Sequence, residues 1–521
     1  MTSTAFTGGL VWTAGFAAPR ELDVLVTGNT ITDVADRGAL ELGDAEIVDL
    51  TGRLLMPGFQ DAHAHVGTGG VDLLTVDLSV ATSVPELYEM IGAYAAAHPE
   101  LEWVIGGGWN RELFTDGVMP NRQTLDELVG GRPAFMQPYD RHGAWVSSAA
   151  LERAGVTADT PDPVGGYFRR EADGTPTGMV EEEAVPIVRA VMPVQTLEER
   201  IAATLRGQEY LLSVGITSVQ DAIVGTGLGL TDHHDAYCAL AGGPDLRLRV
   251  TAALWWDPTR GVEQIPEILE RRRQLEEAAG PEKILADTVK IMVDGSDVLF
   301  MDAARIRDAV VALDGLGFAI HFHAYGDAAT AWILDAVEAA ISENGARPRR
   351  HHIAHLFVVA EPEFARFAEL GVTANVQGFW AGSFVPHEHM GATTRTDHAQ
   401  ELEYPFGRIH AAGARLAGGS DWPVTTADPL VCSLTATGEY VDPEIRRPLA
   451  ERDKLDALAM FTAYTTGSAW VNGRASSTGR IAPGFLADLV VLDGNVFDGP
   501  DALRSARVAE TWIDGRREYA R

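Results

Sequence analysis

Short apolar runs alternate with longer stretches of helical pattern through the middle of the chain. From about residue 214 onward there are seven apolar runs of strand length, and an eighth run lies earlier, just before His63. Alternation of apolar strands with helices over this length predicts a parallel α/β structure, the TIM-like (β/α)8 barrel, with its site where the strands end. The seven later strands are expected at residues 215–221, 248–254, 288–293, 319–323, 351–355, 372–376 and 415–421.

The two ends of the chain differ from the middle. Residues 1–56 and 476–521 carry short β-prone runs broken by Gly, Asn and Asp, which is typical of small sheets with tight turns. Because chain termini often lie close together, we expect both ends to build one small β-sandwich domain beside a barrel domain of residues 57–475. The interval at about 67–213 is too long for one crossover, so we interpret it as an insertion over the barrel mouth, after the first strand.

Composition narrows the class of protein. The 521 residues are 46% hydrophobic and 22% charged, which is typical of a globular protein with room for a barrel and a smaller domain. A net charge of −33 argues against nucleic acid and anionic membranes as partners, so we expect a small-molecule substrate. Two cysteines, no signal-peptide pattern and no long apolar segment favour a cytoplasmic location. The oligomeric state is open, with a homodimer among the options.

The run that ends in His63-Ala64-His65 carries the first chemical signal. Side chains on a strand alternate between its faces, so His63 and His65 point the same way, with Asp61 beside them. Neutral histidine is the commonest protein ligand for zinc-like ions, and two on one face form half of a metal site. Taken alone, the motif is equally well explained by a solvated loop or a satisfied core pair.

Other barrel strands end in further residues that bind metals. A barrel brings residues that are distant in sequence to one rim, so their convergence is more informative than any one of them. Six candidates exceed the roughly four ligands of a single tetrahedral ion, and we therefore expect two divalent ions. The full set is His63, His65, Lys290, His323, His355 and Asp421.

Lys290 is the unusual member of this set. It is one of only three lysines and lies within the apolar run at residues 288–293, where a free ammonium is costly to bury. A buried lysine loses its charge readily, and its neutral amine can react with carbon dioxide to a carbamate whose two oxygens bridge two cations. An ion-paired or snorkelling lysine is the alternative, and it is the simpler one when Lys290 is considered alone.

Six segments carry motifs at and around these candidates. They are residues 56–65 (MPGFQDAHAH), 289–295 (VKIMVDG), 323–327 (HAYGD), 353–355 (IAH), 419–423 (GSDWP) and 484–492 (GFLADLVVL). Together, and over nearly the whole chain, they resemble the amidohydrolase superfamily, specifically its N-substituted formamide deformylase-like branch, amidohydrolase family 3. Two positions depart from the branch, which usually has Glu at Ala354 and Lys at Phe485. The segment between Gly295 and His321 is also shorter than the branch implies, which predicts a trimmed loop at the barrel mouth.

The resemblance implies a role for each metal-binding candidate. His63 and His65 would hold the more buried metal, Lys290 would bridge both metals after N6-carboxylation, and the two remaining histidines would hold the second metal. Asp421 would bind metal and shuttle protons. The resemblance implies zinc as the ion, with manganese or cobalt as alternatives.

Substrate-binding candidates lie mainly in the insertion. The segment at residues 140–146, with Trp109 before it, is similar to the branch's substrate-contacting insertion, which makes His142 a candidate for both substrate binding and catalysis. Trp109 and Trp422 are candidates to line an apolar pocket, although aromatic residues at such places are more often part of the core.

These assignments predict the reaction. We expect a metal-dependent hydrolase that cleaves a carbon–nitrogen bond of an amide or N-substituted formamide with metal-activated hydroxide. Asp421 would take the proton during attack and deliver it to the leaving nitrogen. Ester or cyclic-amide hydrolysis, metal-dependent decarboxylation or isomerisation, and a catalytically silent metal-binding protein are the alternatives.

Overall fold

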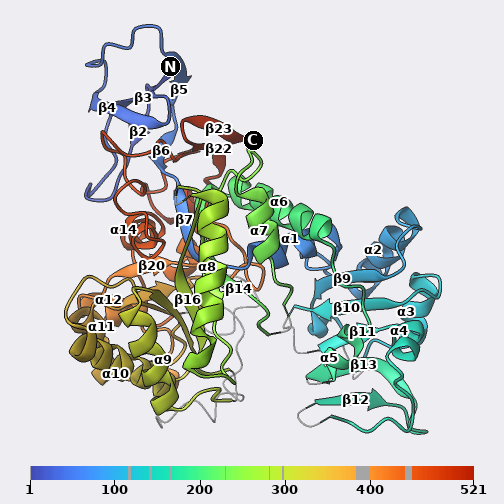
Figure 1. The fold of residues 1–521 in the computed structure, drawn as a ribbon. Helices are drawn as coiled ribbons and strands as arrows, with labels where there is room; N and C mark the ends of the chain where they lie inside the picture. Colours follow the sequence, from blue (N-terminus) through green and yellow to red (C-terminus); the bar gives the residue numbers. More distant parts are fainter. Residues whose placement is uncertain are drawn as a thin grey trace. The chain divides into compact units, whose positions relative to one another are not determined.

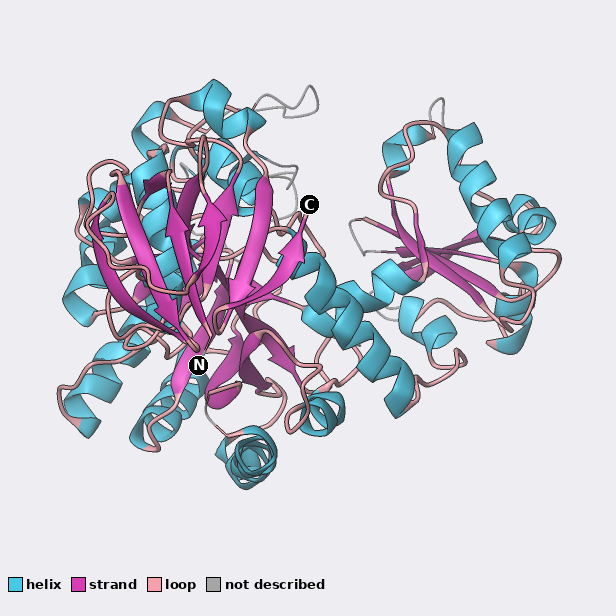
Figure 2. Ribbon diagram, turned by 90° about the horizontal axis from the view of Figure 1, so that it is seen from above, coloured by secondary structure: helices cyan, strands magenta, loops and turns pink. Residues whose placement is uncertain are grey.

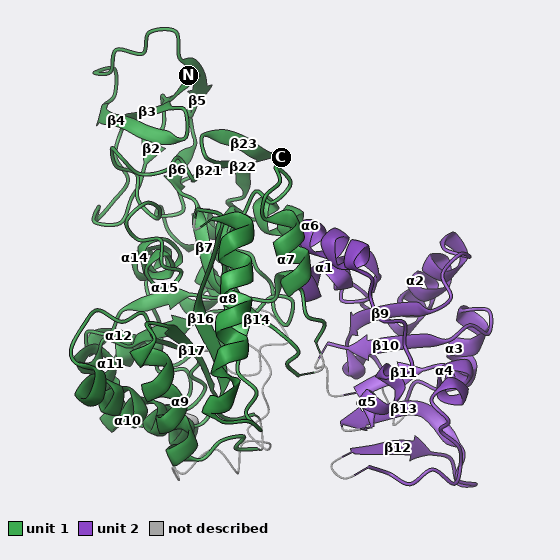
Figure 3. Cartoon of the chain, viewed as in Figure 1, with its two compact units in different colours: residues 1–66, 208–521 green, residues 67–207 purple. Residues whose placement is uncertain are grey.

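The chain divides into two units, which are described separately. Unit 1 comprises residues 1–66 and 208–521, and unit 2 comprises residues 67–207 (Figure 3). The computed structural model describes residues 2–114, 119–139, 143–163, 166–182, 184–228, 230–280, 282–295, 298–382, 399–440 and 449–521.

Eight parallel strands form a (β/α)8 barrel in unit 1, as the sequence predicts. Their order is β7-β14-β15-β16-β17-β18-β19-β20. Figure 1 labels β7, β14, β16 and β20 among them, and Figure 2 distinguishes strands from helices by colour. Two backbone hydrogen bonds join the segment after β20 to β7, from Asp421 N to His63 O and from His65 N to Trp422 O, each 2.7 Å long. The strands are β7 (Phe59–Ala64), β14 (Ile216–Val224), β15 (Arg249–Trp255), β16 (Ile284–Met292), β17 (Ala319–Ala324), β18 (His352–His355), β19 (Thr373–Val376) and β20 (Leu416–Gly418).

Helices alternate with these strands, and polar caps fix several of their ends. Asp302 accepts a hydrogen bond from Arg305 N at 2.9 Å where α9 begins, and α11 ends at Gly371, whose φ of 68° is left-handed. No helix among the described residues is long and apolar enough to cross a membrane. The helices are α6 (Leu197–Ser213), α7 (His234–Leu240), α8 (Ile265–Ala279), α9 (Ala303–Gly315), α10 (Asp327–Asn344), α11 (Phe364–Leu370), α12 (Phe406–Ala411), α13 (Pro429–Ala436), α14 (Ala457–Thr462), a π-helical turn (Ala463–Gly467), α15 (Ser468–Val471) and α16 (Pro500–Ser505).

Two further sheets of unit 1 come from both ends of the chain. One has the order β4-β3-β1-β5 and the other β2-β6-β21-β22-β23. Apolar side chains from both sheets, among them Val24 and Leu489, join one buried cluster. The strands are β1 (Ser3–Thr7), β2 (Leu10–Val11), β3 (Leu22–Thr27), β4 (Thr30–Asp36), β5 (Glu46–Asp49), β6 (Leu54–Pro57), β21 (Leu489–Leu492), β22 (Val508–Ile513) and β23 (Arg516–Ala520).

A single residue, Gly58, separates β6 of the end sheet from β7 of the barrel. A Cβ atom at this position would lie 2.4 Å from the Cγ2 atom of Thr217, which precludes any larger side chain without backbone movement. The end sheet therefore leads directly into the strand that carries His63.

A buried ion cluster links barrel strand β15 to the end sheets. The Arg249 guanidinium is 2% exposed and contacts both carboxylate oxygens of Asp488, at 2.5 and 2.9 Å. The same guanidinium lies 2.5 Å from Asp514, just beyond β22. Because a buried charge needs a partner, the barrel and the C-terminal strands are fixed in one arrangement at this point.

Unit 2 contains a mixed sheet with the order β12-β13-β11-β10-β9-β8. Alternate residues of its strands point to opposite faces, so Met136 joins one apolar cluster and Phe135 another. Its strands are β8 (Val76–Asp77), β9 (Val104–Trp109), β10 (Ala134–Pro138), β11 (Gly143–Val146), β12 (Gly166–Arg170) and β13 (Pro176–Glu182). Its helices are α1 (Val66–Leu74), α2 (Val84–Ala97), α3 (Arg122–Leu128), α4 (Ser148–Arg153) and α5 (Val185–Arg189).

Candidate metal centre

The six candidate ligands all lie in or just beyond barrel strands. His63 and Lys290 belong to β7 and β16, while His323 and His355 stand at the C-terminal ends of β17 and β18. Asp421 follows β20 by three residues. All are buried except His65, whose side chain is 12% exposed.

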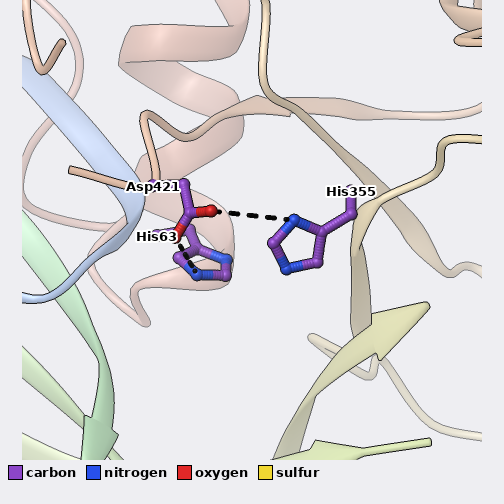
Figure 4. Close-up of side chains that lie close together, drawn as sticks. All are labelled: His63, His355 and Asp421. Atoms are coloured by element: carbon purple, nitrogen blue, oxygen red, sulfur yellow. Dashed lines mark ion pairs between the residues drawn. The ribbon is translucent and has the colours of Figure 1, made fainter. Parts of the chain in front are cut away.

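Three of these residues from different strands meet at one point. Ligand atoms of His63, His355 and Asp421 lie within 4.8 Å of one another (Figure 4). Nε2 of His63 and Nε2 of His65 lie 3.1 and 3.2 Å from Oδ1 of Asp421. Nδ1 of His355 lies 3.9 Å from the other carboxylate oxygen, Oδ2. The centre therefore joins the first, sixth and eighth barrel strands.

His323 and Lys290 complete the group from the side of β16 and β17. The His323 ring lies 4.1 Å from the His355 ring, and its Nε2 atom is 3.9 Å from Oδ1 of Asp294. Burial lowers the pKa of Lys290 to about 7, and the Asp421 carboxylate only partly opposes this shift. A substantial fraction of this amine is therefore neutral near pH 7.

Burial and nearby positive charge keep His63, His323 and His355 uncharged. Burial first and the charge of Lys290 second lower the pKa of His63 to about 3. The same two causes place the pKa of His323 well below its usual value, and burial followed by the nearby His323 does so for His355. Burial opposes ionisation of Asp421, yet its interactions with His63 and His65 hold its pKa well below the usual range. The site thus offers neutral imidazoles and an ionised carboxylate.

This donor set fits a divalent metal. Nε2 of His323 and Nδ1 of His355 are buried and have no hydrogen-bond partner in the described part of the chain. Buried polar atoms are otherwise nearly always paired, so these nitrogens are available as ligands. Ligand atoms on a tetrahedral ion with bonds of about 2.0–2.1 Å lie roughly 3.3–3.4 Å apart, close to the spacings around Asp421.

Two ligands lie in strained backbone. His355 has φ 76° and Asp421 has φ 62°, the left-handed region that side chains other than glycine rarely adopt. Such residues cost on the order of 1–3 kcal/mol and persist only where their surroundings hold them. Hydrogen bonds from Leu356 N to Ala324 O and from Asp421 N to His63 O provide that hold.

Asp61 connects the first and eighth strands below the ligands. Its carboxylate accepts hydrogen bonds from Ser420 Oγ at 2.5 Å, from Ser420 N at 3.0 Å and from His63 N at 2.9 Å. Burial raises the pKa of Asp61 to about 7, although these hydrogen bonds act in the opposite direction. The sequence placed Asp61 beside the histidines but gave no sign of its partner Ser420.

Three other histidines of the barrel are buried rather than exposed. Nε2 of His321 lies 3.0 Å from Nδ1 of His63. His352 lies beside it and contacts Gln220. His351 instead contacts Asp314 at 3.2 Å. All three side chains are buried: His352 faces the barrel interior beside His321, whereas His351 faces helix α9.

The predicted substrate residues have different surroundings. Trp422 is buried, and its ring stacks on Tyr210 with centroids 4.9 Å apart. Trp109 lies in unit 2, where its indole N–H donates to Met136 O within the apolar core. His142 lies outside the described residues. Substrate contact by any of the three stays a prediction.

Further side chains surround the second half of the centre. The Tyr325 ring lies 4.3 Å from His323 and 5.0 Å from His355, and the Trp380 ring lies 5.8 Å from His355. Gln377 follows β19 and is fully buried, with both amide atoms lacking a hydrogen-bond partner in the described part of the chain. For Tyr325, the sequence signal was its position two residues after His323, the candidate ligand in β17.

Comparisons with known proteins agree with this geometry. Residues 46–519 match the protein family described as "Amidohydrolase family". N-substituted formamide deformylase of Arthrobacter pascens is 27% identical over 535 residues, 96% of this chain and 95% of that protein. Protein LONG AFTER FAR-RED 3 of Arabidopsis thaliana is 28% identical over 540 residues, 98% of this chain and 91% of that protein. An uncharacterized metal-dependent hydrolase from Pyrococcus horikoshii has a TM-score of 0.73 at 22% identity, covering 99% and 100% of the two chains.

A (β/α)8 barrel with buried histidine and carboxylate side chains at its strand ends, together with the match to the amidohydrolase family, indicates a metal-dependent hydrolase. The family match extends over most of the chain. The chain belongs to the amidohydrolase family, and the resemblance expected from its motifs is confirmed.

Proposed function

We propose that the chain hydrolyses a carbon–nitrogen bond of an amide or N-substituted formamide at a centre of two divalent ions. The observation that carries this proposal is the meeting of His63, His355 and Asp421, from three barrel strands, at one buried point. We propose zinc as the ion, with manganese or cobalt as alternatives, and His63, His65, Lys290, His323, His355 and Asp421 as the ligands. The 27% identity with an N-substituted formamide deformylase supports the choice of bond.

Divalent ions bound here would lower the pKa of water and polarise a carbonyl group. Lys290 acts as its N6-carboxylated form, because only the uncharged amine reacts with carbon dioxide and burial supplies that form. Oδ1 of Asp421 faces His63 and His65, so Oδ2 is the atom free to take a proton and return it to the leaving nitrogen. The chain's own groups thus hold the centre and move the proton.

The surroundings of His323 and His355 support an amide-sized substrate. Tyr325 and Trp380 present ring faces and edges beside these histidines, which suits the apolar part of a substrate. Asn375 points into the barrel, where it contacts His352. Because alternate residues of a strand face the same side, Gln377 lies on that face too, nearer the end of the strand. Its amide has no hydrogen-bond partner among the described residues and offers both N–H donors and a carbonyl acceptor, the complement of a substrate amide.

Metal content and product analysis test the proposal together. Metal-replete protein should contain two ions per chain by elemental analysis, and His323→Ala should contain one. His410→Ala, at an exposed position, is the matched control and should retain both ions. One ion in the wild type, unchanged in His323→Ala, would defeat the two-ion centre.

A substrate screen in oxygen-18 water decides the reaction class. Amides and N-substituted formamides should be cleaved, with one labelled oxygen entering the acid product. Turnover without label would instead indicate decarboxylation or isomerisation, and cleavage confined to esters or cyclic amides would replace the proposed bond type.

A further inference from the structure

A chain of hydrogen bonds runs beneath the metal centre from Gln220 to His63. Oε1 of Gln220 lies 2.7 Å from Nδ1 of His321 and 2.9 Å from Nε2 of His352. Nε2 of His321 then lies 3.0 Å from Nδ1 of His63. All four side chains are buried in the barrel.

The direction of each hydrogen bond follows from Gln220. Its Nε2 atom lies 3.4 Å from Val471 O, and a carbonyl oxygen only accepts, so this end of the amide must be the donor. Oε1 is therefore the acceptor for both imidazoles, and Nδ1 of His321 and Nε2 of His352 each carry a proton. The bond from Asn375 Nδ2 to Nδ1 of His352 agrees, because Asn375 Nδ2 also donates to Ala62 O.

The proton on Nδ1 of His321 determines what its other nitrogen does. A second proton would make His321 an imidazolium in the barrel interior, with none of the described carboxylates in salt-bridge contact, which is costly. Nε2 of His321 is therefore a bare acceptor, and Nδ1 of His63 must donate to it. This leaves Nε2 of His63 as the ligand atom, 3.1 Å from Oδ1 of Asp421. Two acceptors so close must be bridged by a positive charge, either a proton or a bound metal ion.

We propose that Gln220 and His321 are positioning residues that hold His63 with its proton on Nδ1 and its Nε2 lone pair aimed at the metal. The inference rests on the proposed metal centre but not on its substrate. His65 provides an internal contrast, because its Nδ1 atom has no hydrogen-bond partner in the described part of the chain. The protein scaffold thus fixes the tautomer of one histidine of the pair.

Two substitutions at His321 distinguish the loss of its hydrogen-bond acceptor from the loss of its side-chain volume. His321→Leu fills the space but removes the acceptor, so affinity for zinc, measured against a competing chelator, should fall about 10–100-fold. His321→Gln can accept from His63 and donate to Gln220, so it should restore most of that affinity. His351→Leu is the matched control, because His351 is equally buried but contacts Asp314 instead. It should keep wild-type affinity even where its melting temperature falls.

Nitrogen-15 NMR of metal-free, histidine-labelled protein reads the tautomer directly. The spectrum should show a proton on Nδ1 of His63, assigned by its loss in His63→Gln, and His321→Leu should lose this hydrogen-bonded signal. A bare Nδ1 on His63 in the wild type would overturn the proposal. So would His321→Gln behaving as His321→Leu, or His351→Leu losing equal affinity. If zinc binding follows the expected pattern but no amide is cleaved, the proposed reaction fails while this inference stands.

Discussion

Asp421 combines two features that rarely occur in one residue. Its backbone is left-handed, and its carboxylate is fully buried among imidazoles. The left-handed conformation turns the side chain away from the path of β20 and toward His63, which lies on the neighbouring strand. Strain at this residue therefore follows from placing one carboxylate between ligands of two strands.

Asp421→Asn separates ligation from proton transfer. The amide keeps an oxygen donor but cannot accept the proton, so kcat should fall by about 10²–10⁴-fold while much of the metal remains. Steady-state kinetics and elemental analysis on the same sample measure both. Asp456→Asn is the control, because asparagine caps α14 as well as aspartate does. Loss of metal in step with kcat would make Asp421 chiefly a ligand, whereas normal turnover with full metal would move the proton transfer elsewhere, with His142 the first candidate.

Lys290→Ala tests the carboxylated lysine. The variant should be inactive because alanine cannot supply bridging oxygens, and short carboxylic acids should restore part of the activity by occupying the vacated space. Lys290→Arg keeps a positive charge but cannot form a carbamate, so it should be inactive and should not respond to the acids. Equal responses of the two variants would show that the acids act elsewhere, and an active Lys290→Ala would remove the carbamate from the mechanism.

At the scale of elements, sequence patterns predicted strands better than their ends. The strand expected at residues 319–323 is observed as Ala319–Ala324, because a strand buried on both faces is an uninterrupted apolar run. The strand expected at 415–421 ends at Gly418 instead. Asp421 adopts the left-handed conformation because of its tertiary contacts with β7. No local sequence pattern predicts this conformation.

The same limit applies to the site. Its candidate ligands could be picked out from the sequence because each lies at or near a strand end, where histidine, lysine and aspartate stand out beside an apolar run. Asp61 and Ser420 are 359 positions apart, and Gln220 is 101 positions from His321, so their pairing depends on the closed barrel. Residues that support the candidate ligands are recognised by their side-chain contacts in the folded barrel, and these contacts cannot be read from the sequence.

Helix α9 is fastened to the barrel by a second buried charge cluster. Asp314 accepts hydrogen bonds from Arg349 at 2.8 and 3.0 Å and lies 3.2 Å from Nε2 of His351. Nδ1 of His351 in turn accepts from Ile320 N on β17 at 3.0 Å. Burial alone would raise the pKa of Asp314, but its interactions with His351 and Arg349 hold that pKa well below the usual range.

Asp314→Asn should therefore destabilise the fold in a pH-dependent way. A carboxyl with a depressed folded pKa stabilises the protein above its unfolded pKa of about 3.9, and that contribution is lost as pH falls through the lower folded value. The variant should lose about 3–5 kcal/mol at pH 7, as expected when one partner of a buried pair is removed. Urea unfolding at pH 7, 5 and 3.5 should show the gap narrowing toward acid. Asp335→Asn, in an exposed pair with Arg366, should show little change at any pH, and a pH-independent gap in Asp314→Asn would contradict the assignment.

At the scale of the whole molecule, the Arg249 cluster makes the end sheets part of the barrel's stability. Asp488→Ala leaves the buried guanidinium with Asp514 as its remaining charged partner among the described residues, so the free energy of unfolding should fall by about 3–5 kcal/mol. Thermal unfolding of the metal-free protein measures this. Asp501→Ala removes a carboxylate that is 99% exposed, and it should cost less than about 1 kcal/mol. Equal losses in the two variants would show that the buried cluster contributes no more than a surface pair.

The junction at Gly58 has a consequence for the order of events during synthesis. Strand β6 pairs with β21, and β7 is completed by the segment around Asp421, so the first histidines emerge from the ribosome several hundred residues before either neighbour. A nascent chain that already contains His63 and His65 therefore lacks the other proposed ligands and the strands that hold them. At the proposed centre, metal binding would therefore follow the formation of the late strands, and a chain that ends before Asp421 would lack the complete site.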